Sequence, residues 1–235
     1  MKTESIINFY DRESIEATEF RRLYSNIRNS NDEKLKSVMV TSSVIEEGKS
    51  TVSSYLALSI AENSDDKILL LDADLRRPMI NVFFRLPLET GLADILQKKC
   101  SIKQAVKSTP VTGLSIITAG KLTSDPAAIL SQQPLKEMFE ELKFYFDFII
   151  IDVPPIIPVS DPLIIANEVD GVVIVVRAGK TPREVVKRAV NFLNNSNINV
   201  LGTVLNNLEE VLPYYYSSKY YSYKYYHKSS QKTKK

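Results

Sequence analysis

The sequence contains little cysteine and no long apolar run. Cys100 is the one cysteine among 235 residues, so no disulfide can form within the chain and nothing indicates an oxidising compartment. The first residues, MKTESIINFYDRES, lack the apolar core of a secretory signal and carry acidic residues early. A membrane-spanning helix needs roughly 18 to 20 apolar residues, whereas the longest apolar runs are strand-sized. We therefore expect a cytoplasmic protein that a partner recruits to the inner face of the cell membrane.

Positive and negative charges nearly balance, with a net charge of +2, but they are unevenly distributed. From Val211 onward the chain carries six lysines and no acid, which leaves a net charge of −4 on the rest. Interleaved lysine and tyrosine would suit stacking on single-stranded nucleic acid, and a basic tail also suits anionic lipid. The body shows no further basic patch in its sequence, so we expect no nucleic-acid partner.

A chain of this length with 44% hydrophobic residues suits one sizeable globular domain. Short runs rich in Val, Ile and Leu alternate with helix-length stretches, which predicts a doubly wound α/β fold with a mostly parallel sheet. The predicted strands are Ser37–Thr41, Lys67–Asp72, Leu114–Thr118, Phe146–Asp152, Gly171–Arg177 and Val200–Asn206. The predicted helices are Ser50–Glu62, Pro134–Phe144, Asp161–Asn167 and Pro182–Asn194, the last with Thr181 as its N-cap.

Two segments lie outside this alternation. Ser14 to Asn29 form a predicted amphipathic helix within an N-terminal segment, residues 1–30. The last stretch, residues 213–235, has eight tyrosines between Tyr214 and Tyr226 and almost no aliphatic residue. It cannot bury enough apolar surface to offset the entropy of ordering, so we expect a disordered tail. The globular domain then spans residues 31–212.

A phosphate-binding motif follows the first predicted strand. The segment from Ser43 to Thr51, SVIEEGKST, matches the P-loop pattern GxxxxGK[ST], with Ser43 at the first glycine position. Backbone N–H groups of such a loop and of the following helix cradle phosphates. We expect Lys49 to reach the β- and γ-phosphate oxygens and the Ser50 hydroxyl to ligate Mg²⁺. The predicted ATP-binding residues in this segment are Ser43, Glu47, Gly48, Lys49, Ser50 and Thr51.

Two residues of the loop depart from the small, flexible pair that such a loop favours. Ile45 and Glu46 stand there instead. A carboxylate this close to a triphosphate is repulsive unless it points to solvent. If position 46 also needs a positive φ, glutamate costs roughly 1–3 kcal/mol of strain. The pair is therefore expected to weaken ATP binding without removing a ligand.

Carboxylates follow two further predicted strands. In LLLDADLRRP, Asp72 and Asp74 stand two residues apart at a strand end, so both side chains should point over the phosphates. In FIIIDVPP an apolar strand delivers Asp152, the arrangement by which P-loop proteins hold Mg²⁺ and its waters. We expect Ser50, Asp72 and Asp152 to hold the metal. Asp72 or Asp74 is the predicted proton acceptor, and the sequence does not separate these two roles.

These motifs together resemble those of the bacterial tyrosine kinases of capsule and exopolysaccharide biosynthesis. The likeness continues through GLADIL, DPAAILS, DPLIIANEVDGVVIVVRAGKT and LGTVLNN and covers nearly the whole chain. It implies a P-loop NTPase of the Walker A/A′/B type, as in MinD, with Lys49, Asp72 and Asp74 as catalytic residues. It also implies that Asn206 approaches the adenine.

The resemblance carries expectations about activity and partners. It implies an ATP-dependent protein-tyrosine kinase that autophosphorylates its tail and regulates the synthesis and export of capsular or extracellular polysaccharide. It implies a ring of subunits built through the N-terminal segment, where the family motif Glu-x-x-Arg-x-x-Arg retains Arg21. A membrane adaptor of the polysaccharide co-polymerase type and a cognate tyrosine phosphatase are the other expected partners. The expected phosphoacceptors are Tyr214, Tyr215, Tyr216, Tyr220, Tyr221, Tyr223, Tyr225 and Tyr226.

Two other functions fit parts of the sequence. Partitioning and cell-division ATPases share the same kind of sheet, and their pattern KGGxGK[ST] has a lysine where this chain has Val44. Such an ATPase switch of the MinD and ParA type would also leave the tyrosines unexplained. A nucleotide-binding scaffold without catalysis is the other alternative, suggested by Ile45 and Glu46.

Overall fold

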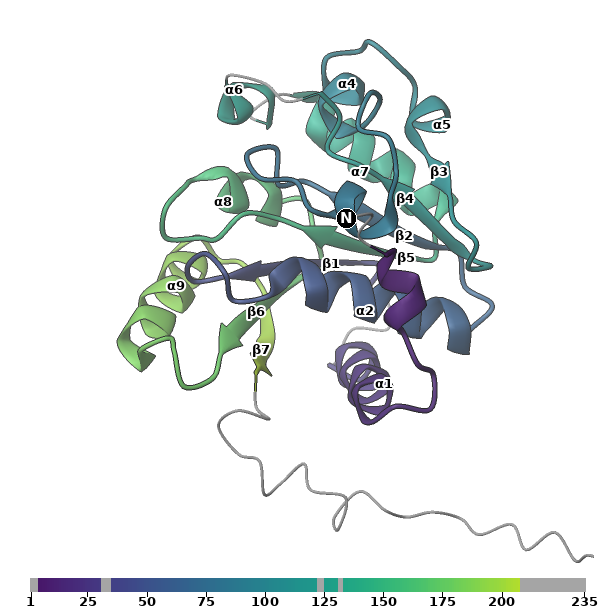
Figure 1. The fold of residues 1–235 in the computed structure, drawn as a ribbon. Coiled ribbons are helices and arrows are strands. Elements are labelled where there is room, and N and C mark those ends of the chain that lie inside the picture. The colour runs from purple at the N-terminus through teal and green to yellow at the C-terminus, as the bar shows by residue number, and fades with distance from the viewer. Residues whose placement is uncertain (1–3, 31–34, 122–124, 131–132, 208–235) are drawn as a thin grey trace, which may run out of the picture.

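The computed structural model of the protein describes residues 4–30, 35–121, 125–130 and 133–207. Its strands are β1 (Ser37–Ser42), β2 (Ile68–Asp72), β3 (Lys107–Ser108), β4 (Leu114–Ile117), β5 (Phe148–Asp152), β6 (Gly171–Arg177) and β7 (Val200–Asn206). They form one sheet in the order β3-β4-β2-β5-β1-β6-β7 (Figure 1). Only β3 pairs antiparallel, so the described sheet is parallel apart from one short edge strand.

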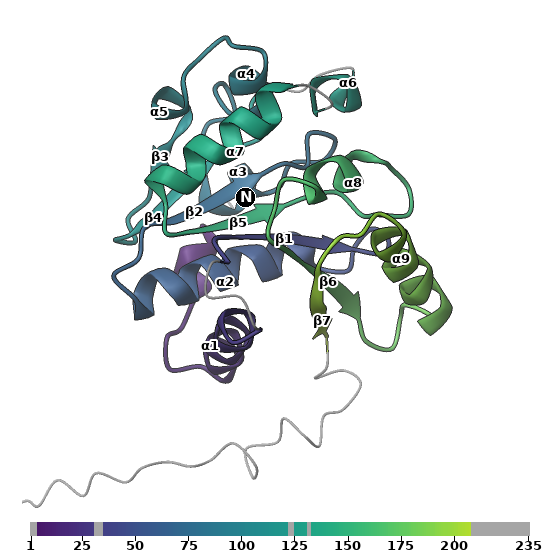
Figure 2. The same cartoon turned by 180° about the vertical axis from the view of Figure 1, so that it is seen from behind.

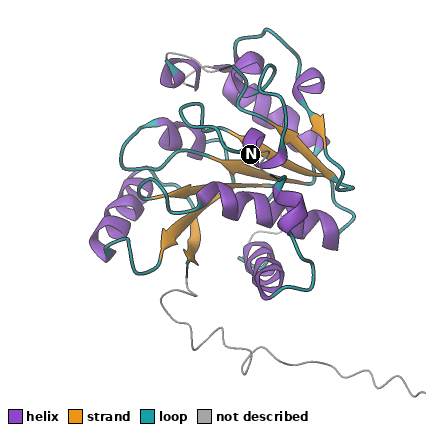
Figure 3. Ribbon diagram, in the orientation of Figure 1, coloured by secondary structure: helices purple, strands orange, loops and turns teal. Residues whose placement is uncertain are grey.

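Helices cover both faces of this sheet. They are the 3-10 turn η1 (Ile6–Phe9), α1 (Ile15–Arg28), α2 (Lys49–Asn63), α3 (Ile80–Phe84), α4 (Leu92–Leu96), α5 (Ile102–Ala105), α6 (Pro126–Leu130), α7 (Gln133–Tyr145), α8 (Asp161–Ala166) and α9 (Arg183–Asn195). Figures 1 and 2 show α1 and α2 on one side of the sheet and α7 with α4 and α5 on the other. Figure 3 shows the alternation of helix and strand that produces these layers.

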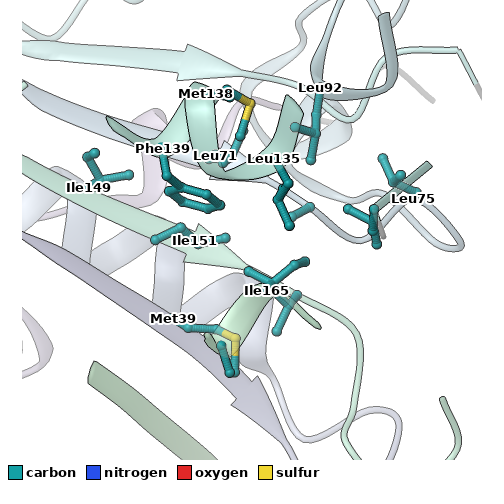
Figure 4. Packing of buried hydrophobic residues seen from close by; sticks show 14 of the residues in the cluster. Met39, Leu71, Leu75, Leu92, Leu135, Met138, Phe139, Ile149, Ile151 and Ile165 are labelled. Atoms are coloured by element: carbon teal, nitrogen blue, oxygen red, sulfur yellow. The ribbon is translucent and has the colours of Figure 1, made fainter. Parts of the chain in front are cut away.

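The sheet separates two hydrophobic clusters because neighbouring residues of a strand face opposite sides. Met39 of β1 packs in the cluster beneath α7, while Val38 and Val40 pack against α2. Figure 4 shows the first cluster, where Phe139 of α7 lies over Ile151 of β5. The central strands are therefore buried on both faces, which explains their unbroken apolar runs.

The six predicted strands and four predicted main helices are present, with ends that shift by one or two residues. The predicted N-cap Thr181 is wrong. Pro182 stands at the cap position of α9 with extended backbone, and the Thr181 hydroxyl donates a hydrogen bond to Glu47 instead of capping the helix. Four helices, α3 to α6, and strand β3 were not predicted, because elements of five residues or fewer show too little periodicity.

The helix predicted near the N-terminus is α1. Ser14 caps it, with its hydroxyl oxygen accepting the N–H of Ala17 at 3.0 Å. One face packs on α2, where the Phe20 and Tyr55 rings lie 5.6 Å apart. The tail, residues 213–235 with all eight predicted phosphoacceptors, lies outside the described residues. Within the described ranges, no helix is long and apolar enough to cross a membrane.

Candidate nucleotide and phosphoryl-transfer site

The predicted P-loop connects β1 to α2 at the carboxyl edge of the sheet, where ligands bind in folds of this class. Gly48 ends the loop with φ 89°, and α2 begins at Lys49. A Cβ atom at position 48 would lie 2.1 Å from Nδ2 of Asn206. Glycine is thus required for both its left-handed backbone and its close contact with β7. The free N–H groups of the first turn of α2 are a ready anion site.

Glu46 adopts the backbone conformation that makes glutamate costly. Its φ is 63°, in the left-handed region, which confirms the condition set out from the sequence. Glu46 and Ile45 are both exposed, so this carboxylate lies at the outer surface of the loop. The loop therefore keeps its phosphate-facing backbone at a cost in strain.

Lys49 lies at the centre of the site between two carboxylates. Its Nζ is 2.8 Å from Oδ2 of Asp74 and 3.7 Å from Oδ2 of Asp152, and it donates to the Ser50 hydroxyl at 3.2 Å. Burial alone lowers the pKa of Lys49, but these carboxylates outweigh burial and raise the pKa above its usual value. The lysine is a fixed cation at the mouth of the P-loop.

Asp72 is oriented differently from Asp74, although the two were expected to point together over the phosphates. Its Oδ1 accepts the N–H of Asp74, and its Oδ2 accepts those of Met79 and Ile80 at 3.2 and 3.0 Å. Asp72 thus shapes the turn that leads into α3, and Asp74 makes the contact with Lys49. Burial, followed by the nearby Asp152 carboxylate, raises the pKa of Asp72 well above its usual range.

Asp152 ends β5 directly opposite Asp72 in the register of the two strands. Its Oδ1 accepts a hydrogen bond from Ser53 at 3.2 Å, while Oδ2 is buried without a hydrogen-bond partner. Burial raises the pKa of Asp152 even though Lys49 opposes this shift. Such an oxygen, beside the Ser50 hydroxyl, is the hard donor that Mg²⁺ prefers, and the excess of carboxylates over cations calls for a cation. The residues therefore fit Mg²⁺.

No group of three or more His, Cys, Asp or Glu side chains in the described part of the chain is arranged to hold an ion alone. That is the expected situation for Mg²⁺ at a P-loop, where waters and phosphate oxygens supply several ligands. The structure brings Lys49, Asp74, Asp152 and Ser50 together. Direct ligation by Asp72 stays a prediction, since both of its oxygens accept backbone N–H groups.

Two contacts of the site were not anticipated from the sequence. Arg76 forms a two-pronged ion pair with Asp161, at 2.7 and 3.0 Å, and Asp161 is fully buried at the start of α8. This pair fixes the turn after Asp72 to the opposite side of the site. Glu47, expected only as a residue of the phosphate loop, buries its carboxylate and bonds to distant segments. Of these two contacts, only the ion pair of Arg76 had a signal in the sequence, which is the motif RRP at residues 76–78.

The strand order, the P-loop and the acids at the ends of β2 and β5 define a P-loop NTPase of the MinD type. In agreement, residues 35–234 match the family model ParA, described as NUBPL iron-transfer P-loop NTPase. The chain is 36% identical to the tyrosine-protein kinase YwqD of Bacillus subtilis, over 86% of this chain and 85% of that protein. It is also 36% identical to the tyrosine-protein kinase CpsD of Streptococcus agalactiae, over 83% and 84% of the two chains.

The solved structures agree with these relatives. The kinase domain of the Escherichia coli tyrosine kinase ETK superposes with a TM-score of 0.82 at 26% identity, covering 88% of this chain and 81% of that one. The chain therefore belongs to the bacterial tyrosine-protein kinases, and its enzyme class is protein-tyrosine kinase. Nucleotide binding follows from its membership of the P-loop class.

Proposed function

We propose that the chain uses Mg²⁺·ATP to phosphorylate the C-terminal tail tyrosines of neighbouring copies of the same chain. The observation that carries the proposal is the position of Asn206, whose Nδ2 donates to the Glu47 carbonyl at 2.9 Å. The last described strand thus ends against the P-loop. Tyr214 follows Asn206 by eight residues and Tyr226 by twenty, so the first tyrosine is tethered within about 28 Å of the edge of the P-loop and the last within about 70 Å, which lets the tail reach the site of an adjacent copy. A tether raises the effective substrate concentration, and weak intrinsic affinity suffices.

The reaction needs one bond formed and one broken. The phenol oxygen of a tyrosine attacks the γ-phosphorus, the bond from that phosphorus to the bridging oxygen breaks, and ADP leaves. Lys49 binds the β- and γ-phosphate oxygens, and Thr51, Gly48 and the loop amides hold the rest of the phosphates. The phenolic proton passes to the carboxylate of Asp72 or Asp74. Ser50 and Asp152, with Asp72 nearby, would hold Mg²⁺, which would neutralise charge on the phosphates.

Phosphorylation would reverse the charge of the tail. Each phosphate adds about −1.5 to −2 charges, so a few phosphorylations cancel six lysines and make the tail repel the acids of the site. This supports a cycle in which a ring of subunits assembles through residues 1–30 and unphosphorylated tails, then separates. A cognate phosphatase would reset the tail, and a membrane adaptor would recruit and activate the kinase for polysaccharide synthesis and export.

The alternative is an ATPase switch that hydrolyses ATP without tyrosine transfer. Val44, which stands where such switches have a lysine, argues against it. The decisive difference is the product. Tyrosine transfer yields phosphotyrosine and ADP, whereas a switch yields free phosphate and ADP.

A mixing experiment tests the proposal. A chain carrying Lys49→Met keeps its tail but loses the P-loop cation. A chain truncated after Leu212 keeps the site but loses the eight tail tyrosines. Neither should label itself with phosphotyrosine in Mg²⁺·ATP, with or without an adaptor's cytoplasmic peptide. Their mixture should label the Lys49→Met chain. Absence of phosphotyrosine in the mixture and in the parent, alongside release of free phosphate, would support the switch instead.

A further inference from the structure

Glu47 buries a carboxylate inside the P-loop. Its side chain is 2% exposed, and its Oε2 accepts the N–H groups of Ser43 and Val44 at 2.7 and 2.9 Å. No lysine, arginine or histidine forms an ion pair with it within the described ranges. A buried carboxylate without a cation must be satisfied by hydrogen-bond donors, and here the loop's own amides supply two of them.

The second carboxylate oxygen of Glu47 accepts hydrogen bonds from residues outside the P-loop. Its Oε1 accepts the hydroxyl of Thr181 at 2.5 Å and the N–H of Arg177 at 3.4 Å. These donors lie at the end of β6 and just before α9. The Glu47 carbonyl meanwhile accepts from Asn206 at the end of β7. One residue thus joins the P-loop to the ends of two strands that follow it by more than 100 residues.

The connection made by Glu47 to Arg177 and Thr181 lies at a cleft that these three residues help to line. This cleft of about 410 Å³ separates the outer part of the loop from the segment after β6, with Val44, Ile45, Lys180, Pro182 and Val185 among its lining residues. Across such a cleft the loop is held by polar contacts. The loop also carries the left-handed Glu46, so its conformation needs compensating interactions to persist.

We propose that Glu47 is a positioning residue, whose carboxylate holds the P-loop in its phosphate-binding shape by fixing it to Thr181 and Arg177. Both carboxylate oxygens are directed at the loop amides and at these two donors, so Glu47 acts on the nucleotide through the backbone that the phosphates contact. The inference rests on nucleotide binding at the P-loop and is independent of where the phosphoryl group goes.

Affinity for ADP with Mg²⁺, measured by calorimetry on the full chain, tests this role. Replacing Glu47 with alanine removes all four side-chain contacts and should weaken binding by about 10-fold or more. Glu47→Gln should bind ADP more tightly than Glu47→Ala, because the glutamine oxygen can still accept from the loop amides and its NH₂ can donate to Thr181. Thr181→Val, which keeps the side-chain shape, should weaken binding by about 3- to 10-fold.

The two sites should also be coupled. If Thr181 acts through Glu47, the double variant with Glu47→Ala and Thr181→Val binds ADP no worse than Glu47→Ala alone. Independent, additive losses would overturn the connection between them.

A matched control separates positioning from general stability. Asp94 is 8% exposed and accepts the Gly91 N–H at 3.0 Å at the start of α4, away from the P-loop. Asp94→Ala should lower the unfolding temperature. It should leave the Kd for ADP unchanged at about 25 °C, where the folded state still predominates. ADP affinity in Glu47→Ala equal to that of the parent, or tighter because a negative charge has gone, would overturn the inference. A parent that binds ADP but makes no phosphotyrosine would overturn the proposed function alone.

Discussion

Lys49 of the P-loop is paired with Asp74 from the end of β2, with 2.8 Å between Nζ and Oδ2 and both side chains largely buried. The cation that the phosphates need is therefore already engaged by a carboxylate. Nucleotide binding must share Lys49 between Asp74 and the phosphate oxygens. This competition weakens nucleotide binding. Asp74 should therefore affect both the affinity for nucleotide and the rate of phosphoryl transfer.

Asp74→Asn should consequently separate binding from catalysis. Removing one negative charge beside Lys49 should tighten ADP binding by about 3- to 10-fold. Phosphotyrosine formation should fall, because Asp74 can no longer position the lysine or accept a proton. Calorimetry and a phosphotyrosine immunoblot measure the two effects. Glu140→Gln, the same charge change on the exposed side of α7, is the control and should alter neither.

Asp152→Asn should stabilise the free protein and abolish its response to magnesium. Asparagine can still accept from Ser53 while removing a fully buried charge, so the unfolding free energy should rise by about 1 kcal/mol. Mg²⁺ should no longer tighten ADP binding, because its carboxylate ligand is gone. Thermal unfolding and titrations with and without Mg²⁺ measure both results.

Asp161 provides the contrast to Asp152. It is equally buried but pairs with Arg76 through two short hydrogen bonds, whereas Asp152 lies 3.7 Å from Lys49, a cation that it shares with Asp74. Asp161→Asn breaks a two-pronged ion pair and should destabilise the protein by about 2–4 kcal/mol. A gain of stability in both variants would show that burial alone, and not pairing, decides the effect. Loss of stability in Asp152→Asn would contradict the prediction for the metal site.

Glu46→Gly should relieve the strain in the P-loop. Glycine adopts φ 63° without steric cost, so the protein should gain about 1 kcal/mol of stability, and nucleotide should bind more tightly because a nearby carboxylate is removed. The matched control is Arg85→Gly, at φ 54° after α3 and outside the site. It should stabilise to a similar extent and leave ADP affinity as it was. Unchanged stability in both variants would mean that neither backbone is strained.

Asp170 makes stability depend on acid pH. Burial alone raises the pKa of Asp170, but the Lys143 ammonium at 2.7 Å, the N–H of Lys36 and the hydroxyl of Ser37 outweigh it and hold the pKa below its usual range. Because its folded pKa is depressed, the stabilisation is present above the unfolded value and is lost as pH falls through the folded value.

Asp170→Asn should therefore lose about 1–3 kcal/mol of unfolding free energy at pH 7. The difference from the parent should shrink below about pH 4, where the unfolded parent becomes protonated. Urea unfolding across this range measures it. The control Asp147→Asn removes the charge from a carboxylate that accepts one exposed hydrogen bond, from the Lys67 N–H, and should show a smaller effect. A gap that stays constant down to pH 2 would refute the assigned role.

Much of the site could be predicted because its parts are contiguous in the sequence. The P-loop runs directly from β1 into α2, so residue spacing alone predicted that Gly48, Lys49 and Ser50 lie at a helix start. Asp72 and Asp152 each end an apolar strand, and parallel strands bring their carboxyl ends to one edge. The short helices α3 to α6 were missed because four or five residues carry almost no periodic signal.

The alternating strands and helices, the phosphate loop and the acids around it can be predicted from local sequence, because they depend on residue pattern and backbone chemistry over short stretches. The donors that bond to Glu47, the acid that pairs with Arg76 and the contact of Asn206 with the P-loop depend on how the chain folds in three dimensions. The partners in these contacts are 134, 85 and 159 residues apart. No periodicity spans such separations, since the contacts exist only once the sheet has brought the strand ends together.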